Sequence, residues 1–333
     1  MNLEFNIVWV EAGRSVPKYA INNFNLTNKL HPKISKYLVT DSKDTFKDLK
    51  VLEISDAKKS QETKNFEAID KIWPHKQEYF WHGTTARFFH LYDAMINFNL
   101  RNVVHLETDS ILLHTEAIHS ILVDTKIRMA FPLQAKRVGC ASILFIRNAE
   151  DLKSFIDLIV MNWHRKDVDD MVLLGEFSDK SGVKVLATSI ESSEPRPDFI
   201  FDAGSIGHYF MGTDARNCRL PFSKRGIADR REGSIGRLLE QGALNFASSL
   251  ETRRIQISIK GSSTRLANIH LHSKSISPRI FLMNVVFKIG FGKRILFLWR
   301  LGFFDEEVFM ERLASFWARR VKRDKNFQER VFR

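Results

Sequence analysis

Two carboxylates interrupt an apolar run that is typical of a buried strand. In the stretch NVVHLETDSILL, Glu107 and Asp109 stand two residues apart, with apolar residues before and after them. Residues two apart in an extended segment project to the same side, so both carboxylates can face one ligand. Hard divalent ions such as Mg²⁺ or Mn²⁺ take oxygen ligands and are commonly shared between carboxylates and a substrate's phosphates. The alternative is an acidic turn that ends the strand.

Two histidines and a lysine stand close together much later in the chain, in the segment NIHLHSK. If this segment is a strand, His270 and His272 share one face while Ile269 and Leu271 point to the core. Neutral imidazole is a common ligand of Mn²⁺ and other transition ions. Lys274 would project near the same face and could meet a phosphate as a point charge. The pattern also fits two half-exposed histidines on an amphipathic strand.

Two other sets of charged residues stand beside apolar segments. Asp169 and Asp170 precede the run MVLLGEF, where acidic residues favour the first turn of a helix. A carboxylate there would also suit a group that orients an acceptor hydroxyl or removes its proton. Arg87, in the segment that leads to the Glu107 strand, can pair with a carboxylate or with substrate phosphate. Alternatively, Arg87 lies on a solvated helix surface.

These residues need a scaffold, and the first half of the chain predicts one. Strand-like and helical segments alternate with short connections, which predicts an α/β fold with a mostly parallel central sheet flanked by helices. In such sheets ligands bind outside the carboxyl ends of the strands, where Glu107 and Asp109 stand. The second predicted helix has Thr84 or Thr85 available as its N-cap. We expect strands at residues 5–10, 36–41, 49–54 and 102–106, and helices within 17–30 and 83–100.

The second half predicts further elements and an appendage. We expect a strand at 140–148, helices at 149–163 and 169–177, and late strands within 253–261 and 268–274. Residues 178–235 are richer in Gly, Ser, Pro and Arg and predict loops with short strands. From residue 277 the chain is apolar and basic, which indicates two or three helices. We therefore expect an α/β domain over residues 1–276 and a helical C-terminal appendage over 277–333.

Composition limits the partners and the compartment. The 333 residues carry a net charge of +12, which favours an anionic partner such as nucleotide phosphates, nucleic acid or an anionic membrane face. No helix-turn-helix, RNP or zinc-finger pattern is present, so nucleic acid is not expected. The two cysteines, Cys140 and Cys218, have no CxxC spacing, which fits a reducing compartment. Neither a signal peptide nor a spanning segment is predicted, so we expect a cytoplasmic protein.

The order of these elements resembles that of the metal-dependent GT-A glycosyltransferases, which bind nucleotide sugars. The stretch RFFHLYDAMINFNLRNVVHLETDSILL looks like their helix and DxD-type strand, with Glu107 in place of the first Asp. SILFIRN and DDMVLLGEF are similar to the next strand and helix of glycogenin-like and bacterial polysaccharide or lipopolysaccharide transferases. An Asp-Gln pair stands there where Asp170 and Met171 stand here. HLHSK resembles their late metal-binding His and phosphate-contacting Lys. The resemblance covers roughly residues 3–275.

The resemblance implies transfer of a sugar from a nucleoside-diphosphate sugar, with a UDP-sugar favoured, to a glycan or a lipid-linked saccharide acceptor. It implies Mn²⁺ or Mg²⁺ held by Asp109, Glu107 and His272, with the ion stabilising the departing diphosphate. Lys274 and Arg87 would add positive charge at that leaving group.

The resemblance also implies where the rest of the donor and the acceptor lie. The nucleotide base would lie near Glu11, Gly13 and Asp41, after the first two strands. Asp170 would contact the transferred sugar or the acceptor, with Asp202 as the alternative. Asp202 also fits a loop held by hydrogen bonds, and Gly212–Gly236 fits either a mobile lid or a disordered loop.

Other functions remain open from the sequence. A metal-dependent phosphohydrolase would use the same acidic and histidine residues. The basic C-terminal stretch WARRVKRDKNFQERVFR, with its interleaved aromatic residues, fits a helix in peripheral contact with an anionic inner membrane face. It equally fits a helical cap on the core or on another subunit. A basic binding protein without catalysis is therefore a further alternative.

Overall fold

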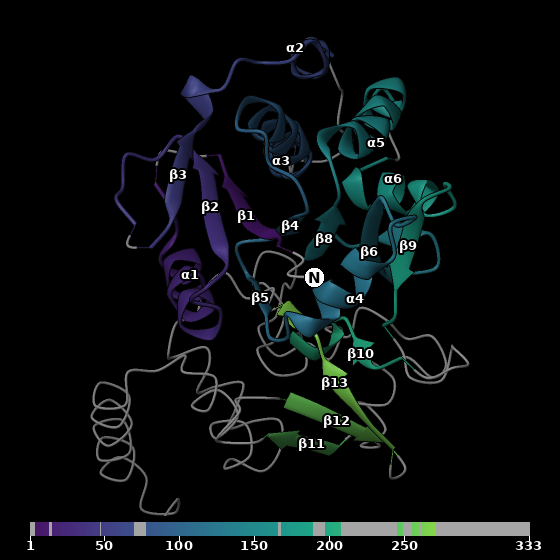
Figure 1. Cartoon of the computed structure of the whole chain (residues 1–333). Coiled ribbons are helices and arrows are strands. Elements are labelled where there is room, and N and C mark those ends of the chain that lie inside the picture. Colours follow the sequence, from purple (N-terminus) through teal and green to yellow (C-terminus); the bar gives the residue numbers. More distant parts are fainter. Residues whose placement is uncertain are drawn as a thin grey trace, which may run out of the picture.

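The fold is built on an eight-stranded sheet in the order β3-β2-β1-β4-β8-β6-β7, with β9 beside β6 (Figure 1). The computed structural model describes residues 4–12, 15–46, 48–69, 78–165, 168–188, 197–207, 245–248, 255–259 and 262–270. The strands of this sheet are β1 (Asn6–Glu11), β2 (Ser35–Thr40), β3 (Lys50–Glu53), β4 (Val103–Leu106), β6 (Met129–Ala135), β7 (Val138–Gly139), β8 (Ile143–Ile146) and β9 (Val183–Leu186). The helices are α1 (Lys18–Leu30), α2 (Gln61–Glu67), α3 (Glu78–Asn97), α4 (Glu116–Val123), α5 (Ala149–Asn162) and α6 (Asp170–Phe177).

Parallel pairing dominates the half of the sheet that carries the site. Strands β3, β2, β1 and β4 run parallel to one another. Strand β8 runs antiparallel to both of its neighbours, β4 and β6, and β9 runs parallel to β6. The register pairs Glu11 with Thr40 and Val8 with His105, so β2, β1 and β4 end at one edge of the sheet. The predicted α/β fold with a mostly parallel central sheet is confirmed.

Helices cover both faces of this sheet, which explains why β1 is apolar at every position from Ile7 to Val10. Val8 and Val10 pack with side chains of α2, α3, α5 and α6 on one face. Ile7 and Trp9 pack with α1 and α4 on the other. A strand buried on both faces gains from apolar residues at every position and not only at alternate ones.

Two small sheets lie below the main one (Figure 1). One has the order β10-β13-β12-β11, and the other pairs β14 with β5. The strand bounds are β5 (Ser110–Leu112), β10 (Phe199–Ile200), β11 (Asn245–Ser248), β12 (Ile255–Ile259), β13 (Ser262–Leu266) and β14 (Asn268–His270). Because β14 pairs with β5, which directly follows the Glu107–Asp109 turn, it brings a distant part of the sequence to the sheet edge.

Most expected elements are found close to their predicted bounds, with one clear exception. The helix expected to begin after Thr84 or Thr85 begins at Glu78, so the predicted N-cap is wrong. Gly83 lies inside α3 and not before it. An internal glycine costs a helix only about 1 kcal/mol relative to alanine, so its presence does not mark where the helix begins. No helix within the described ranges is long and apolar enough to cross a bilayer. The expected appendage over 277–333 and the expected lid over 212–236 lie outside the described residues.

Candidate functional site

The two carboxylates lie in a turn at the carboxyl end of β4. Ser110 N donates to Glu107 O at 2.8 Å, which closes the turn, and Glu107 N donates to Ser142 O at 3.3 Å. The segment is therefore not the continuous extended strand that placed both side chains on one side. The turn nevertheless brings them together, and Asp109 is buried.

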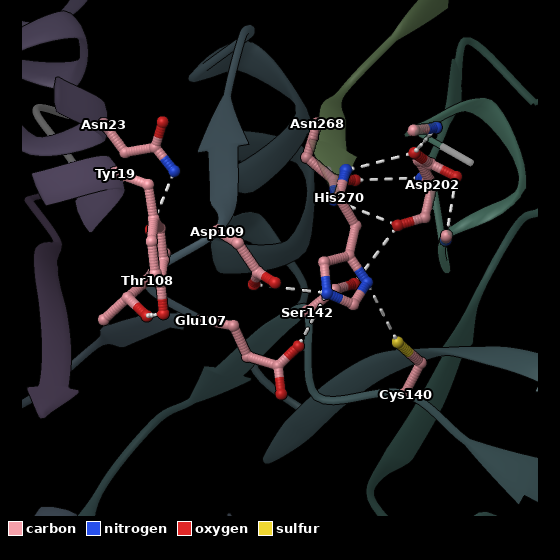
Figure 2. Close-up of polar contacts among 12 residues, drawn as sticks. Tyr19, Asn23, Glu107, Thr108, Asp109, Cys140, Ser142, Asp202, Asn268 and His270 are labelled. Carbon is pink, nitrogen blue, oxygen red and sulfur yellow. Dashed lines mark hydrogen bonds and ion pairs between the residues drawn. The ribbon is translucent and has the colours of Figure 1, made fainter. Parts of the chain in front are cut away.

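Helix α1 holds this turn from the side opposite to β14 (Figure 2). Asn23 Nδ2 donates to Thr108 O at 2.7 Å, and the Tyr19 hydroxyl lies 3.5 Å from Thr108 Oγ1. Asn23 is fully buried. The backbone between the two carboxylates is thus fixed by a helix that packs against the same sheet.

His270 completes a group of three side chains that could hold a metal ion. Its Nε2 lies 2.9 Å from Glu107 Oε2 and 3.3 Å from Asp109 Oδ1 (Figure 2). One ligand atom from each residue lies within 4.8 Å of the others. The pairing of His270 with Ser110 across β14 and β5 produces this approach. The predicted ligand, His272, lies outside the described residues, and the structure brings its neighbour His270 to the carboxylates.

Without a metal ion, a proton on His270 offsets negative charge on Glu107 and Asp109. Burial lowers the pKa of His270, but the carboxylates of Asp109 and Glu107 outweigh it and raise this pKa well above the usual value. Burial raises the pKa of Glu107, yet Arg87 and His270 bring it well below the usual value. An imidazolium between two carboxylates occupies the place where a divalent cation would satisfy the same negative charge.

Arg87 joins the carboxylate turn to helix α6. Its guanidinium forms an ion pair with Glu107 Oε1, and Nη2 lies 2.9 Å from Asp170 Oδ2. The expected pairing of Arg87 with a strand-end carboxylate is confirmed. With its side chain only 14% exposed, the alternative of a solvated surface residue is wrong.

The two aspartates at the start of α6 have different tasks. Asp169 is the N-cap, and its side chain accepts a hydrogen bond from Val172 N at 2.9 Å. Asp170 is fully buried and turns to Arg87. Its other oxygen, Oδ1, has no hydrogen-bond partner within the part of the chain that the structure describes. A buried acceptor without a donor is a position where a hydroxyl or a water gains a hydrogen bond.

Arg87 binds both Glu107 and Asp170, but the two pKa values move in opposite directions. Burial raises the pKa of Asp170 to about 6, and Arg87 only partly offsets it. Glu107 has a second positive neighbour in His270, whereas Asp170 stands next to Asp169. Asp170 is therefore the carboxylate of this site with a pKa near neutrality, as suits a group that exchanges a proton with a hydroxyl.

Helix α6 is held very close to the β6–β7 turn, which fixes the position of Asp170. A Cβ at Gly175 would overlap the carbonyl of Arg137, and one at Gly139 would overlap Leu174 Cβ. Only glycine permits backbones to approach in this way. The helix that carries Asp170 is thus located by direct backbone contact.

Asp202 belongs to the loop that supports His270. Its Oδ1 accepts from Gly204 N at 2.8 Å and Ile206 N at 3.0 Å. Its Oδ2 accepts from Gly207 N at 2.9 Å and from His270 N at 3.0 Å. These bonds match the second of the two roles expected for Asp202, a loop held by hydrogen bonds, and not a contact with the sugar or the acceptor. With four backbone donors on its carboxylate, Asp202 anchors the main chain of His270.

Two of the residues expected near the nucleotide base, Glu11 and Asp41, lie at the same edge of the sheet. Glu11 ends β1 and Asp41 directly follows β2, and these strands neighbour β4 in the order β2-β1-β4. Gly13 and Lys274, the other two residues of the predicted donor site, lie outside the described residues.

Replacing Asp170 with asparagine is expected to stabilise the protein above about pH 6. The folded-state pKa of about 6 exceeds the ordinary 3.8. The native state therefore bears a cost that develops as the pH rises from 3.8 through 6. An uncharged amide removes that cost, a gain of up to about 3 kcal/mol at 1.36 kcal/mol per pKa unit.

Urea unfolding of both proteins at pH 4 and pH 8 measures this difference. The gain should be present at pH 8 and nearly absent at pH 4. An asparagine variant that is less stable than the parent at pH 8 would show that the bond to Arg87 outweighs burial.

Comparison of the sequence finds no match, whereas comparison of the structure finds similar solved structures. No protein-family model and no curated protein matches the sequence. Mouse xyloside xylosyltransferase 1 in its apo form is similar over 55% of this chain and 85% of that one, at 10% identity and a TM-score of 0.39. An active-site mutant of LgtC is similar over 86% of this chain and 98% of that one, at 12% identity and a TM-score of 0.44.

Glycosyltransferases are thus among the similar structures, as the resemblance of the sequence leads one to expect. A cytidylyltransferase from Leptospira borgpetersenii is also similar, over 54% of this chain and 74% of that one, at 8% identity and a TM-score of 0.32. Side chains, and not these likenesses, must therefore decide what the site does.

Proposed function

We propose that the protein is a metal-dependent glycosyltransferase, which moves a sugar from a nucleoside-diphosphate sugar to a hydroxyl of a glycan or lipid-linked acceptor. The observation that carries this proposal is the convergence of Glu107, Asp109 and His270. The three meet at the carboxyl edge of parallel strands, where sheets of this kind bind their ligands. The same elements carry the sequence resemblance to GT-A glycosyltransferases.

The donor set fits Mn²⁺ or Mg²⁺. Glu107, Asp109 and His270 would hold the ion through two carboxylates and one imidazole, and the diphosphate of the donor would offer it further oxygen ligands. The imidazole makes Mn²⁺ the better match of the two. His270 would hold the ion as neutral imidazole, so it would give up the proton that it carries between the same carboxylates.

In the proposed mechanism, one end of the site offsets the negative charge of the leaving diphosphate. A bound metal ion would act as a Lewis acid that neutralises the charge on the leaving nucleoside diphosphate. Arg87 holds the Glu107 carboxylate in place and offsets part of the negative charge of the site. Lys274 is proposed as a second cation for the diphosphate, and Glu11, Gly13 and Asp41 are proposed to line the place of the nucleotide.

Asp170 is proposed to serve the sugar end of the site. Its Oδ1 is buried and accepts from no donor among the described residues, and its Oδ2 is held by Arg87. A hydroxyl of the transferred sugar or of the acceptor would donate to Oδ1. With a pKa near neutrality, this carboxylate suits a proton exchange with that hydroxyl.

Thermal unfolding with UDP, GDP, CDP and their sugars, each with and without Mn²⁺, tests the proposal. A ligand at about 100 times its dissociation constant adds about 2.7 kcal/mol if it binds only the native state. We expect a melting shift that needs both Mn²⁺ and one class of nucleotide, with UDP first among them. Asp109→Ala should abolish it.

Two controls separate transfer from other chemistry. Incubating the bound sugar nucleotide with the protein but without acceptor tests for a phosphohydrolase, which would split the diphosphate with water into a nucleoside monophosphate and a sugar phosphate at full rate. Vesicles with anionic headgroups test for binding through the C-terminal stretch. No Mn²⁺-dependent shift with any nucleotide, in a protein that melts cooperatively, would contradict the proposed function.

A further inference from the structure

We infer that Cys140 is a positioning residue that fixes the ring of His270 in the tautomer and orientation needed for metal binding. The inference rests on the proposed function, because it concerns the same site. Cys140 Sγ lies 3.7 Å from His270 Nδ1, on the ring edge opposite to the carboxylates (Figure 2). Both residues are about 3% exposed. The imidazole is therefore held between a thiol and two carboxylates.

The chemistry of the imidazole ring requires such a partner. A neutral imidazole has one N–H, and the nitrogen that binds a metal must offer its lone pair. Since Nε2 faces Glu107 and Asp109, the proton must lie on Nδ1. Nδ1–H then donates to the sulfur of Cys140, which serves as a weak acceptor. Loss of the group that receives this N–H commonly costs a metal site about 10- to 100-fold in affinity.

The main chain on both sides of this contact is already fixed. Cys140 N donates to Pro132 O at 2.9 Å, which ties the residue to β6. His270 N donates to Asp202 Oδ2 at 3.0 Å, which anchors its backbone. These bonds place the main chain of the two residues and involve no atom of the imidazole ring. The ring is oriented by its own contacts, which include the two carboxylates at Nε2 and the sulfur at Nδ1.

Calorimetric titration of the full chain with Mn²⁺ tests the inference through two substitutions. Cys140→Ala removes the acceptor and is expected to weaken Mn²⁺ binding by about 10-fold or more. Cys140→Ser keeps an acceptor of similar size and is expected to remain within about 3-fold of the parent. Ile146→Val, at the far end of β8, is the matched control for a small loss of core packing. It should leave Mn²⁺ affinity unchanged.

Nitrogen NMR of histidine-labelled protein provides a readout that packing alone would not change. With Mg²⁺ bound, the parent should show His270 protonated at Nδ1, and Cys140→Ala should show a mixture of tautomers or a mobile ring. His270→Gln identifies the signal among the 11 histidines. A parent protein with the proton on Nε2 would overturn the inference even if Cys140→Ala failed to fold.

The outcomes separate this inference from the proposed function. Mn²⁺ binding that is absent from the parent protein would overturn the metal site itself. Binding that is lost in Asp109→Ala but unchanged in Cys140→Ala would keep the metal site and overturn the role of Cys140. An equal loss in Cys140→Ala and Cys140→Ser would also count against it, because serine retains an acceptor.

Discussion

His270→Ala is expected to abolish Mn²⁺ binding and to lower sugar transfer by about 10³-fold or more. The substitution removes one of three ligands and leaves Glu107 and Asp109 facing each other without a cation between them. Loss of a Lewis acid removes several kcal/mol of transition-state stabilisation, and about 4 kcal/mol corresponds to 10³-fold in rate. Calorimetry with Mn²⁺ and a transfer assay with the sugar nucleotide found by thermal unfolding measure the two effects.

His272→Ala is the matched control for this experiment. It removes the same chemical group two residues along the chain, and we expect it to retain Mn²⁺ binding. A protein that tolerates the loss of His270 but not that of His272 would restore the ligand predicted from the sequence. Loss of binding in both variants would mean that the ion takes two imidazoles.

Arg87→Ala is expected to destabilise the fold by about 3–5 kcal/mol, the usual cost of removing one partner from a buried ion pair. Arg87 is the shared partner of Glu107 and Asp170, so its loss leaves two carboxylates in a buried region. Urea unfolding at pH 8, where both carboxylates are ionised in the parent protein, measures the loss.

A second substitution identifies charge as the cause. Asp170→Asn in the Arg87→Ala background removes the carboxylate that the loss of Arg87 leaves without a cation, because Glu107 keeps His270 as a partner, and we expect it to recover part of the stability. Arg87→Lys keeps the charge but lacks the planar guanidinium that binds two carboxylates at once. Its stability should therefore lie between those of the parent protein and Arg87→Ala. If Arg87→Ala lost stability equally with and without Asp170→Asn, packing of the arginine stem would be the cause.

The sheet and its acidic edge could be predicted because they depend on short stretches of sequence. Continuous apolar runs such as the one around Val104 indicate strands buried on both faces, and Glu107 marks the end of one of them. The capping role of Asp169 was likewise predictable, because it depends only on the residues that follow.

The place of His270 beside the carboxylates was not predictable from the sequence, for a physical reason. Residues two apart in a strand share a face, so periodicity treats both histidines alike. The register of β14 against β5, which pairs His270 with Ser110, is what brings His270 to the carboxylates. Local propensity carries no information about a pairing between segments so far apart. The thiol of Cys140 gave no signal either, because a cysteine before an apolar run also suits a plain core residue.

The pairing of β14 with β5 also sets the order in which the protein can mature. During synthesis β4 and β5 leave the ribosome long before β14, so the parallel strands β3, β2, β1 and β4 can associate before His270 has been made. A metal ion at the proposed site would therefore not guide the early folding of the sheet, because Glu107 and Asp109 would still be without the third proposed ligand. A tightly held ion there would mark a chain that has been translated through His270 and has paired β14 with β5.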